Sequence, residues 1–199
     1  MTNRQDKVLA LAKRKGVLRV KDLSEVGIHP EYLRRLCAKG VLVRIDRGLY
    51  VPADAQLSAN AGLAQVARRV PHGVICLLSA LRFHEIGTAH PFEVWIALDQ
   101  GARRPRVEYP PLRVVRFSGK AFTEGVERRR IESVPVQVYN PAKTVADCFK
   151  YRNKIGLDVA LEALRECLRS RRCTRAQLWQ YAKICRVAEV MRPYLEAIS

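Results

Sequence analysis

The 199-residue sequence has few acidic residues, and it lacks the long apolar segments that mark membrane and secreted proteins. No apolar run approaches the ~20 residues that a helix needs to cross a bilayer. The first residues, Met1 to Asp6, are polar and contain no apolar signal-peptide segment. From these absences we expect a cytoplasmic protein that does not bind a membrane.

Acidic side chains are outnumbered almost two to one, with 19 Asp and Glu against 36 Lys and Arg. The formal net charge is +17, and the isoelectric point is near 10.2. Because a surplus of this size repels itself in the folded state, we expect a polyanionic partner, with nucleic acid ahead of an anionic membrane surface. Hydrophobic residues make up 48% of the chain, which is enough for a folded core.

The spacings that mark metal sites are missing. The six cysteines form no C-x-x-C pair, and the four histidines are scattered along the chain. We therefore expect no metal and no cofactor, and we interpret the cysteines as reduced thiols, several of them buried. A metal site built from His84, His90 and a distant cysteine is the weaker alternative.

Motifs typical of enzymes are also absent: the sequence has no P-loop, no G-x-G-x-x-G and no G-x-S-x-G. We therefore do not expect an enzyme. One alternative is a metal-dependent nuclease in which Glu93 and Asp99 hold Mg²⁺, but no Glu-x-Lys follows, and we interpret both as charges on a solvent face. Lys143 and Asp147 are spaced for an i,i+4 ion pair on a helix.

The first 52 residues predict a winged helix-turn-helix. Gly and Pro residues divide the segment into short helices and a basic hairpin, and Pro30 opens the third helix. The expected elements, in order, are a helix at 3–15, a strand at 17–20, a helix at 21–26, a helix from 30 to Gly40, and hairpin strands at 42–45 and 49–51. Residues 53–59 are small and polar, as is typical of a linker.

The remainder, 60–199, predicts a mixed α/β domain that ends in helices, so the fold class is α+β. Asn140 and Pro141 are expected to begin the helical end of the chain. The expected helices are 61–70, one within 74–86 capped by Ser79, 157–168, 174–184 and 188–198. The expected strands are 92–98, half-buried, 112–117 and 134–139, with basic loops at 101–106 and 127–130.

The third helix and the hairpin predict a DNA-binding face. Polar and basic residues lie off the apolar stripe of the helix, as on a helix that enters the major groove, and the amides at its N-terminus suit a phosphate. The candidate residues are His29, Glu31, Tyr32, Arg34, Arg35 and Lys39 on the helix and Arg44 and Arg47 on the wing. The alternatives are an RNA- or protein-binding module, or ordinary solvated charges on a packing unit.

A second basic surface is predicted from residues 101–130, which hold nine basic residues against three glutamates. Such a surface could hold flanking DNA, RNA or an acidic protein, and the alternative is a solvated face of loops. The candidate residues are Arg103, Arg104, Arg106, Arg113, Arg116, Arg128, Arg129 and Arg130.

Three stretches resemble the AbiEi antitoxins of type IV toxin–antitoxin systems. Residues 16–52 resemble their N-terminal winged helix, and 77–98 together with 138–167 resemble their C-terminal domain. The resemblance implies a repressor of its own operon that binds inverted-repeat operator DNA and counteracts a nucleotidyltransferase-like toxin. It also assigns Tyr32, Arg34 and Arg35 to the reading helix and Arg44 and Arg47 to the wing. Lys143, Thr144 and Asp147 match a motif of the family whose role we expect to be structural before functional.

Overall fold

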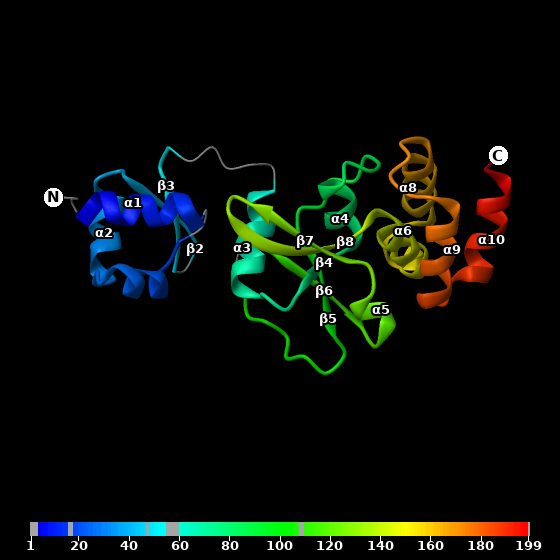
Figure 1. Cartoon of the computed structure of the whole chain (residues 1–199), viewed down its shortest axis with the longest axis horizontal. Helices are drawn as coiled ribbons and strands as arrows, with labels where there is room; N and C mark the ends of the chain where they lie inside the picture. Colours follow the sequence, from blue (N-terminus) through cyan, green and yellow to red (C-terminus); the bar gives the residue numbers. More distant parts are fainter. Residues whose placement is uncertain (1–3, 16–17, 47, 55–59, 108–109, 199) are drawn as a thin grey trace. The chain divides into compact units, whose positions relative to one another are not determined.

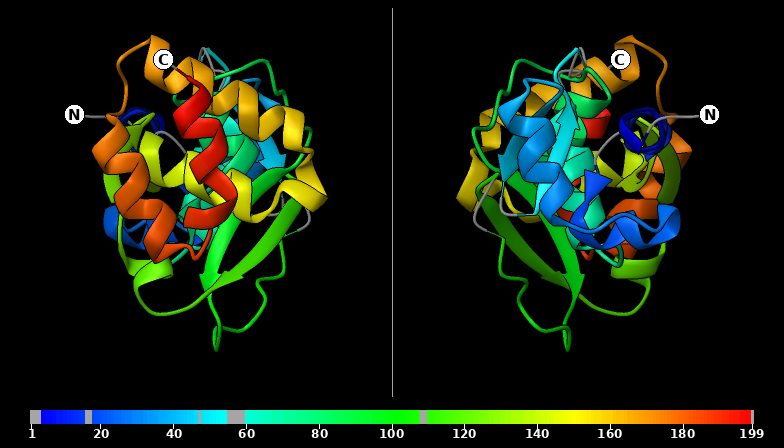
Figure 2. Two further views of the ribbon diagram at one scale, coloured as in Figure 1. Left: turned by 90° about the vertical axis from the view of Figure 1, so that its right-hand side faces the viewer. Right: turned by 90° about the vertical axis from the view of Figure 1, so that its left-hand side faces the viewer.

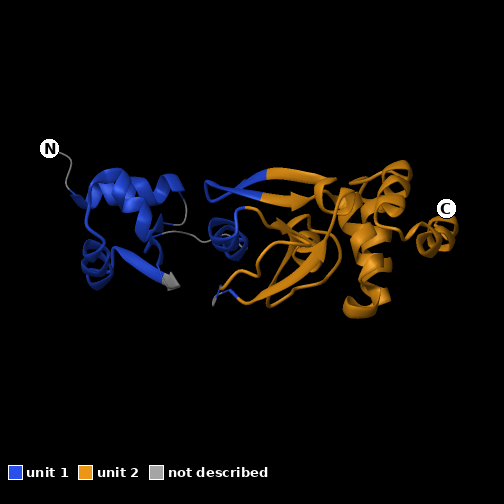
Figure 3. Ribbon diagram, turned by 90° about the horizontal axis from the view of Figure 1, so that it is seen from below, with its two compact units in different colours: residues 1–71, 107–110, 129–136 blue, residues 72–106, 111–128, 137–199 orange. Residues whose placement is uncertain are grey.

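The computed structural model describes residues 4–15, 18–46, 48–54, 60–107 and 110–198. These form two compact units (Figure 3). The first comprises residues 1–71, 107–110 and 129–136, and the second comprises 72–106, 111–128 and 137–199. The α+β fold class predicted from the sequence is confirmed. In the part of the chain that is described, no helix is both long and apolar enough to cross a membrane.

The first unit begins with a helix-turn-helix and a small sheet (Figure 1). Its elements are α1 (Arg4–Lys15), β1 (Leu18–Arg19), the 3₁₀ helix η1 (Val20–Val26), α2 (Glu31–Ala38), β2 (Leu42–Asp46) and β3 (Leu49–Pro52). The strands form an antiparallel sheet in the order β1-β3-β2. This is the winged helix that the sequence predicts, followed after residue 59 by α3 (Ala61–Arg69).

Leucine side chains make most of the core of the winged helix. Each helix contributes one apolar stripe, which α1 supplies through Val8 and Leu11 and α2 through Leu33 and Leu36. The turn between η1 and α2 depends on Gly27, whose φ of 63° is a left-handed value that glycine adopts without strain. The stripe leaves the opposite side of α2 to solvent.

The second sheet has five strands in the order β6-β5-β4-β8-β7 (Figures 1 and 2). The strands are β4 (Val74–Ile75), β5 (Val94–Asp99), β6 (Leu112–Phe117), β7 (Val126–Ile131) and β8 (Val134–Tyr139). The sheet is mixed, because β4 pairs antiparallel with β5 but parallel with β8, and β5 pairs parallel with β6. β6 and β7 are therefore the two edge strands.

Helices accompany this sheet and make up the C-terminal part of the second unit (Figures 1 and 2). They are α4 (Leu77–Phe83), α5 (Lys120–Thr123), α6 (Pro141–Lys150), α7 (Arg152–Ile155), α8 (Leu157–Arg169), α9 (Arg175–Ile184) and α10 (Ala188–Ala197). α6 lies at the centre, because it packs against α4, α8, α9 and α10. As the sequence predicts, Asn140 caps α6, and its side-chain oxygen accepts the Lys143 amide at 2.8 Å.

Three local predictions were wrong. Ser79 does not cap α4, which begins at Leu77; it is buried, and its hydroxyl accepts the Trp95 amide at 2.9 Å. Residues 127–130 lie in strand β7 rather than in a loop, since an edge strand tolerates a run of exposed charges. Strand β5 is buried from Val94 to Leu98 rather than half-buried, because it is an interior strand with α4 and α5 against it.

The cysteine prediction also needs correction. Cys76, Cys148 and Cys185 are buried thiols, as expected. Cys167 and Cys173, however, form a disulfide with their Cα atoms 5.8 Å apart. The two lie six residues apart, near the end of α8 and just before α9, so only the helix-to-helix turn brings them together.

The predicted ion pair of Lys143 and Asp147 is confirmed, but it is buried completely. The Lys143 ammonium contacts both Asp147 oxygens at 2.6 and 2.7 Å, and both side chains are 0% exposed. The ammonium also lies 3.9 Å from the ring centroid of Tyr139 and 4.6 Å from that of Phe117. Burial and the Asp147 carboxylate raise the pKa of Cys185 to about 12, so its thiol stays neutral and donates to Asp147 at 3.3 Å. The motif is thus a buried structural centre.

We expect Lys143→Met to lower the free energy of unfolding by about 3–5 kcal/mol, because it leaves the Asp147 carboxylate buried without its counter-ion. Lys143→Met combined with Asp147→Leu removes both charges and should recover most of that loss. Urea unfolding followed by tryptophan fluorescence measures this, since Trp95 and Trp179 both lie in the second unit. A double variant no more stable than the single one would contradict the expectation.

Candidate nucleic-acid interface

Helix α2 presents a polar face to solvent. His29, Glu31, Arg34, Arg35 and Lys39 are exposed, and Tyr32 is half-buried. The buried side of the helix holds Leu33 and Leu36. The predicted candidates from 29 to 39 therefore lie on α2 or beside its two ends and are accessible, which is what contact with a large ligand requires. Their contact with DNA remains a prediction.

The amides at the start of α2 are already used within the protein. The Glu31 amide donates to Nδ1 of His29 at 3.3 Å, the Tyr32 amide donates to the His29 carbonyl at 3.0 Å, and the Leu33 amide donates to the Pro30 carbonyl at 3.0 Å. Pro30 has no amide hydrogen. This corrects the expectation that the helix terminus suits a phosphate, because an anion near α2 must be held by side chains instead.

Arg34 and Arg35 point in different directions, although they are neighbours in the sequence. Successive residues of an α-helix are rotated by about 100° around its axis. The Arg34 guanidinium lies 3.8 Å from the Glu31 carboxylate, and the Arg34 side chain is 83% exposed. Arg35 instead lines a cleft beside the helix. The two arginines are therefore not equivalent.

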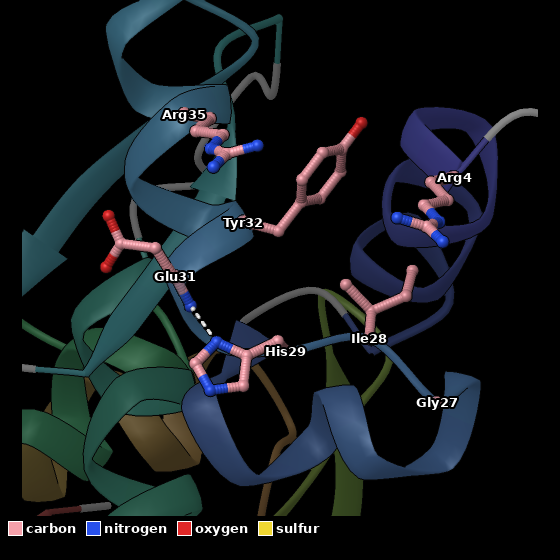
Figure 4. A pocket seen from close by; sticks show the side chains of 7 residues that line it. All are labelled: Arg4, Gly27, Ile28, His29, Glu31, Tyr32 and Arg35. Carbon is pink, nitrogen blue, oxygen red and sulfur yellow. Dashed lines mark hydrogen bonds between the residues drawn. The ribbon is translucent and has the colours of Figure 1, made fainter.

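The cleft has a volume of about 450 Å³ and lies between the start of α1 and the start of α2 (Figure 4). Figure 4 shows the Tyr32 ring between the guanidinium groups of Arg35 and Arg4, with the Glu31 carboxylate directed to the other side. The residues that line the cleft are Arg4, Gly27, Ile28, His29, Glu31, Tyr32 and Arg35. Sequence reasoning missed Arg4, since nothing in its local pattern distinguishes it from other charges on α1.

The hairpin of β2 and β3 forms the wing. Arg44 is exposed and lies opposite Tyr50 in the pairing, with an irregular register between Arg44 and Asp46. Burial raises the pKa of the Cys37 thiol, and the positive charge of Arg44 acts against this rise, so the wing lies close to α2. Arg47 lies outside the described residues, and its role stays a prediction.

One buried carboxylate holds this unit together. The Asp22 side chain is 5% exposed, accepts the Arg19 amide at 2.7 Å and the Lys15 ammonium at 3.1 Å, and also contacts Arg68 of α3. Burial acts against ionisation, but the Arg19 and Lys15 hydrogen bonds and the charge of Arg68 outweigh it and hold the pKa of Asp22 below its usual value. The ionised Asp22 therefore links α1, β1, η1 and α3.

The residues of the predicted second basic surface do not form one patch. Arg113 and Arg116 lie on edge strand β6, whereas Arg128, Arg129 and Arg130 lie on β7 at the opposite edge of the sheet. With strands ~4.8 Å apart, four steps separate the two edges by roughly 19 Å. Arg103, Arg104 and Arg106 are exposed in the loop between β5 and β6. Only this loop and β6 could act together.

The carboxylates of the alternative nuclease site are far apart. Glu93 precedes β5 and Asp99 ends it, so at ~3.3 Å per residue their backbones are about 20 Å apart. Glu93 also accepts the Arg113 side chain at 2.7 Å, and Asp99 accepts the Gly101 amide at 3.1 Å. The two carboxylates cannot share one metal ion. His84, from the other metal alternative, is buried and donates through Nε2 to the Tyr139 carbonyl at 2.7 Å.

Residues 6–53, which contain α1, the helix-turn-helix and the wing, match the family model described as "Transcriptional regulator, AbiEi antitoxin". The N-terminal part of the chain is thus similar to the AbiEi antitoxin and transcriptional regulator family. The match includes every described residue on the polar face of α2. Arg4 lies just outside the AbiEi match.

The whole chain has the fold of a solved structure, the RV2827C protein from Mycobacterium tuberculosis. The TM-score is 0.62 at 17% sequence identity, and the alignment covers 100% of this chain and 81% of that one. No curated protein matches the sequence. The similarity to AbiEi regulators therefore concerns the N-terminal region, whereas the likeness of the C-terminal unit to a known protein concerns its fold alone.

We expect Asp22→Asn to destabilise the winged helix by about 1–3 kcal/mol at neutral pH, because it removes the charge that Lys15, Arg19 and Arg68 contact. The pKa of Asp22 is lowered in the folded state, so its stabilising effect is present above the usual carboxyl pKa of ~3.9 and is lost as pH falls through the lower, folded value. The variant and the native protein should therefore converge in stability as the solution becomes acidic.

Hydrogen exchange of the α1 and η1 amides measures this stability within the full chain. The matched control is Asp54→Asn, which breaks a surface pair with Lys13 whose side chains are 61% and 67% exposed. An Asp22→Asn variant that behaves like this control at every pH would show that Asp22 does not stabilise the unit.

Proposed function

We propose that this protein is a DNA-binding autorepressor and the antitoxin of a type IV toxin–antitoxin system, acting in the cytoplasm. The winged helix binds double-stranded operator DNA with inverted repeats in the protein's own promoter. The observation that carries the proposal is the exposed, mostly basic face of α2 beside the wing, within a region that matches a transcriptional-regulator family. The proposed role is binding rather than catalysis.

The geometry supports a division of tasks within the winged helix. A helix of this size fits the major groove, where an arginine can donate two hydrogen bonds to guanine. Arg34 is the most suitable reader because its side chain is 83% exposed and is not among the residues that line the cleft. Arg44 is exposed on the wing and is proposed to hold the DNA backbone, and the same role stays predicted for Arg47. The net charge of +17 favours association with any polyanion.

The second unit is proposed to supply the antitoxin activity against a nucleotidyltransferase-like toxin. Its support is the resemblance of 77–98 and 138–167 to AbiEi antitoxins. The buried Lys143–Asp147 pair gives the Asn-Pro-x-Lys-Thr-x-x-Asp part of that resemblance a structural role. Its basic loop at 101–106 and strand β6 offer an exposed charged surface outside the winged helix.

DNA binding can be tested with DNA from upstream of the gene. We expect specific binding that weakens steeply with salt, with a slope of about −4 in a plot of log K against log salt if four phosphates are contacted. An unrelated duplex of equal length should bind more weakly, and a structured RNA is the second comparison. Absent or salt-insensitive binding would contradict the proposal, and equal binding to the RNA would favour an RNA-binding module instead.

Antitoxin activity can be tested separately with a nucleotidyltransferase-like protein encoded beside the gene. Expression of that protein should arrest bacterial growth, and co-expression of this full chain should restore it. The matched control is the full chain with Arg34→Ala, which should lose operator specificity but still restore growth, because the proposed antitoxin unit is unchanged. Persistent arrest with the native chain would contradict the antitoxin half of the proposal.

A further inference from the structure

The cleft beside α2 has the composition of an anion site. Arg4 comes from α1 and Arg35 from α2, and the Tyr32 side chain lies between them (Figure 4). Two guanidinium groups and a phenol offer donors that suit the oxygens of a phosphate, and arginine can donate two hydrogen bonds to one such group. Arg4 has no role in any part of the function proposed above.

The charges around the cleft favour an anion. Among the lining residues that the structure describes, Glu31 is the one carboxylate, and Figure 4 shows it directed away from Arg4 and Tyr32. It lies 3.8 Å from Arg34. The positive charges of Arg4 and Arg35 are therefore not offset within the cleft by this group.

The position of the cleft favours a phosphate of the DNA backbone as the anion. It lies beside the first turn of α2, the part of such a helix that comes closest to the DNA. Its volume of about 450 Å³ is much larger than a single phosphodiester, so the group can enter while still linked to its neighbours in the strand. The backbone amides of this turn are occupied, so the contacts must come from the side chains.

We propose that Arg4 and Arg35, with Tyr32, bind one backbone phosphate of the DNA in this cleft. This proposal rests on the proposed function. It separates two arginines that the sequence groups together: Arg35 positions the protein on the backbone, whereas Arg34 is left to contact bases. It also extends the DNA-binding surface from α2 and the wing to the start of α1.

The first measurement is the salt dependence of binding to the upstream DNA. Arg4→Gln and Arg35→Gln should each weaken binding, and the double variant should reduce the slope of log K against log salt by about 0.9 in total, because the two arginines share one phosphate; this corresponds to about an eightfold loss of affinity at 0.1 M salt. The loss should be equal for the operator and for an unrelated duplex, because a phosphate carries no sequence information. The matched control is Arg14→Gln, an exposed arginine of α1 that pairs with Glu25 and does not line the cleft.

The second measurement maps the phosphate directly. Ethylation of a backbone phosphate interferes with binding where the protein contacts it, and the native protein and Arg14→Gln should give the same pattern. Arg4→Gln and Arg35→Gln should both lose interference at the same position. Loss at two different positions, or behaviour of Arg4→Gln like that of Arg14→Gln, would overturn the inference.

The two proposals fail in distinguishable ways. If the native protein binds no DNA, the proposed function itself is wrong. If it binds its operator but the pattern of Arg4→Gln matches that of the native protein, DNA binding stands and the cleft has no part in it. Because Arg4 is exposed, its replacement should leave the thermal unfolding temperature of the protein unchanged. A lowered unfolding temperature would therefore distinguish a folding defect from a lost DNA contact.

Discussion

The winged helix depends on a single buried carboxylate, that of Asp22. Around it meet Lys15 from the end of α1, the Arg19 amide from β1, and Arg68 from α3. A carboxylate buried without partners would be strongly unfavourable, so this arrangement is stable only when the surrounding elements are all in place. Asp22 thus joins the end of α1 to β1, η1 and α3. The cleft that contains Arg4 and Arg35 lies at the other end of α1.

The second unit also contains a buried ion pair, and this pair is shielded from solvent even more completely. Lys143 and Asp147 are excluded from solvent completely, and the ammonium is surrounded by the carboxylate and two aromatic rings. Gly125 is required beside it, because a Cβ there would lie 2.8 Å from the Cβ of Lys143. In both units a charged residue, Asp22 or Lys143, forms a buried ion pair, although its local sequence does not distinguish it from a surface charge. The positive charge that remains on the surface is then available for a partner.

The basic residues are distributed unevenly over the structure, which the net charge of the chain does not reveal. Helix α2, the wing and α1 carry the basic residues of the predicted DNA-binding region, whereas the candidates of the predicted second basic surface are divided between two edges of a sheet and a loop. Electrostatic attraction to a polyanion acts over a Debye length of about 10 Å at 0.1 M salt, so charges separated by the width of a sheet act on different parts of a partner. The winged helix is therefore the main candidate for tight contact.

Structural features that depend on residues close together in the sequence could largely be predicted from the sequence. Local spacing is sufficient to define a helix stripe such as that of Leu33 and Leu36, a stop such as Gly27, and a cap such as Asn140, because each depends on neighbours within one or two turns. By itself the sequence thus determined the winged helix, the α+β class and the exposed face of α2. Charged strand β7 was missed, since its stability comes from pairing with β8 and not from its own pattern.

Contacts between residues far apart in the sequence were decided by the tertiary structure alone. Arg4 joins Arg35 across 31 positions, Asp22 joins Arg68 across 46, and the two edges of the five-stranded sheet separate arginines that lie only 12 positions apart, at 116 and 128. Sequence spacing carries no information on such contacts, because the packing of whole elements determines which side chains meet. The sequence therefore determined which residues are available for binding, and the packing of the elements decided which of them can act on the same group.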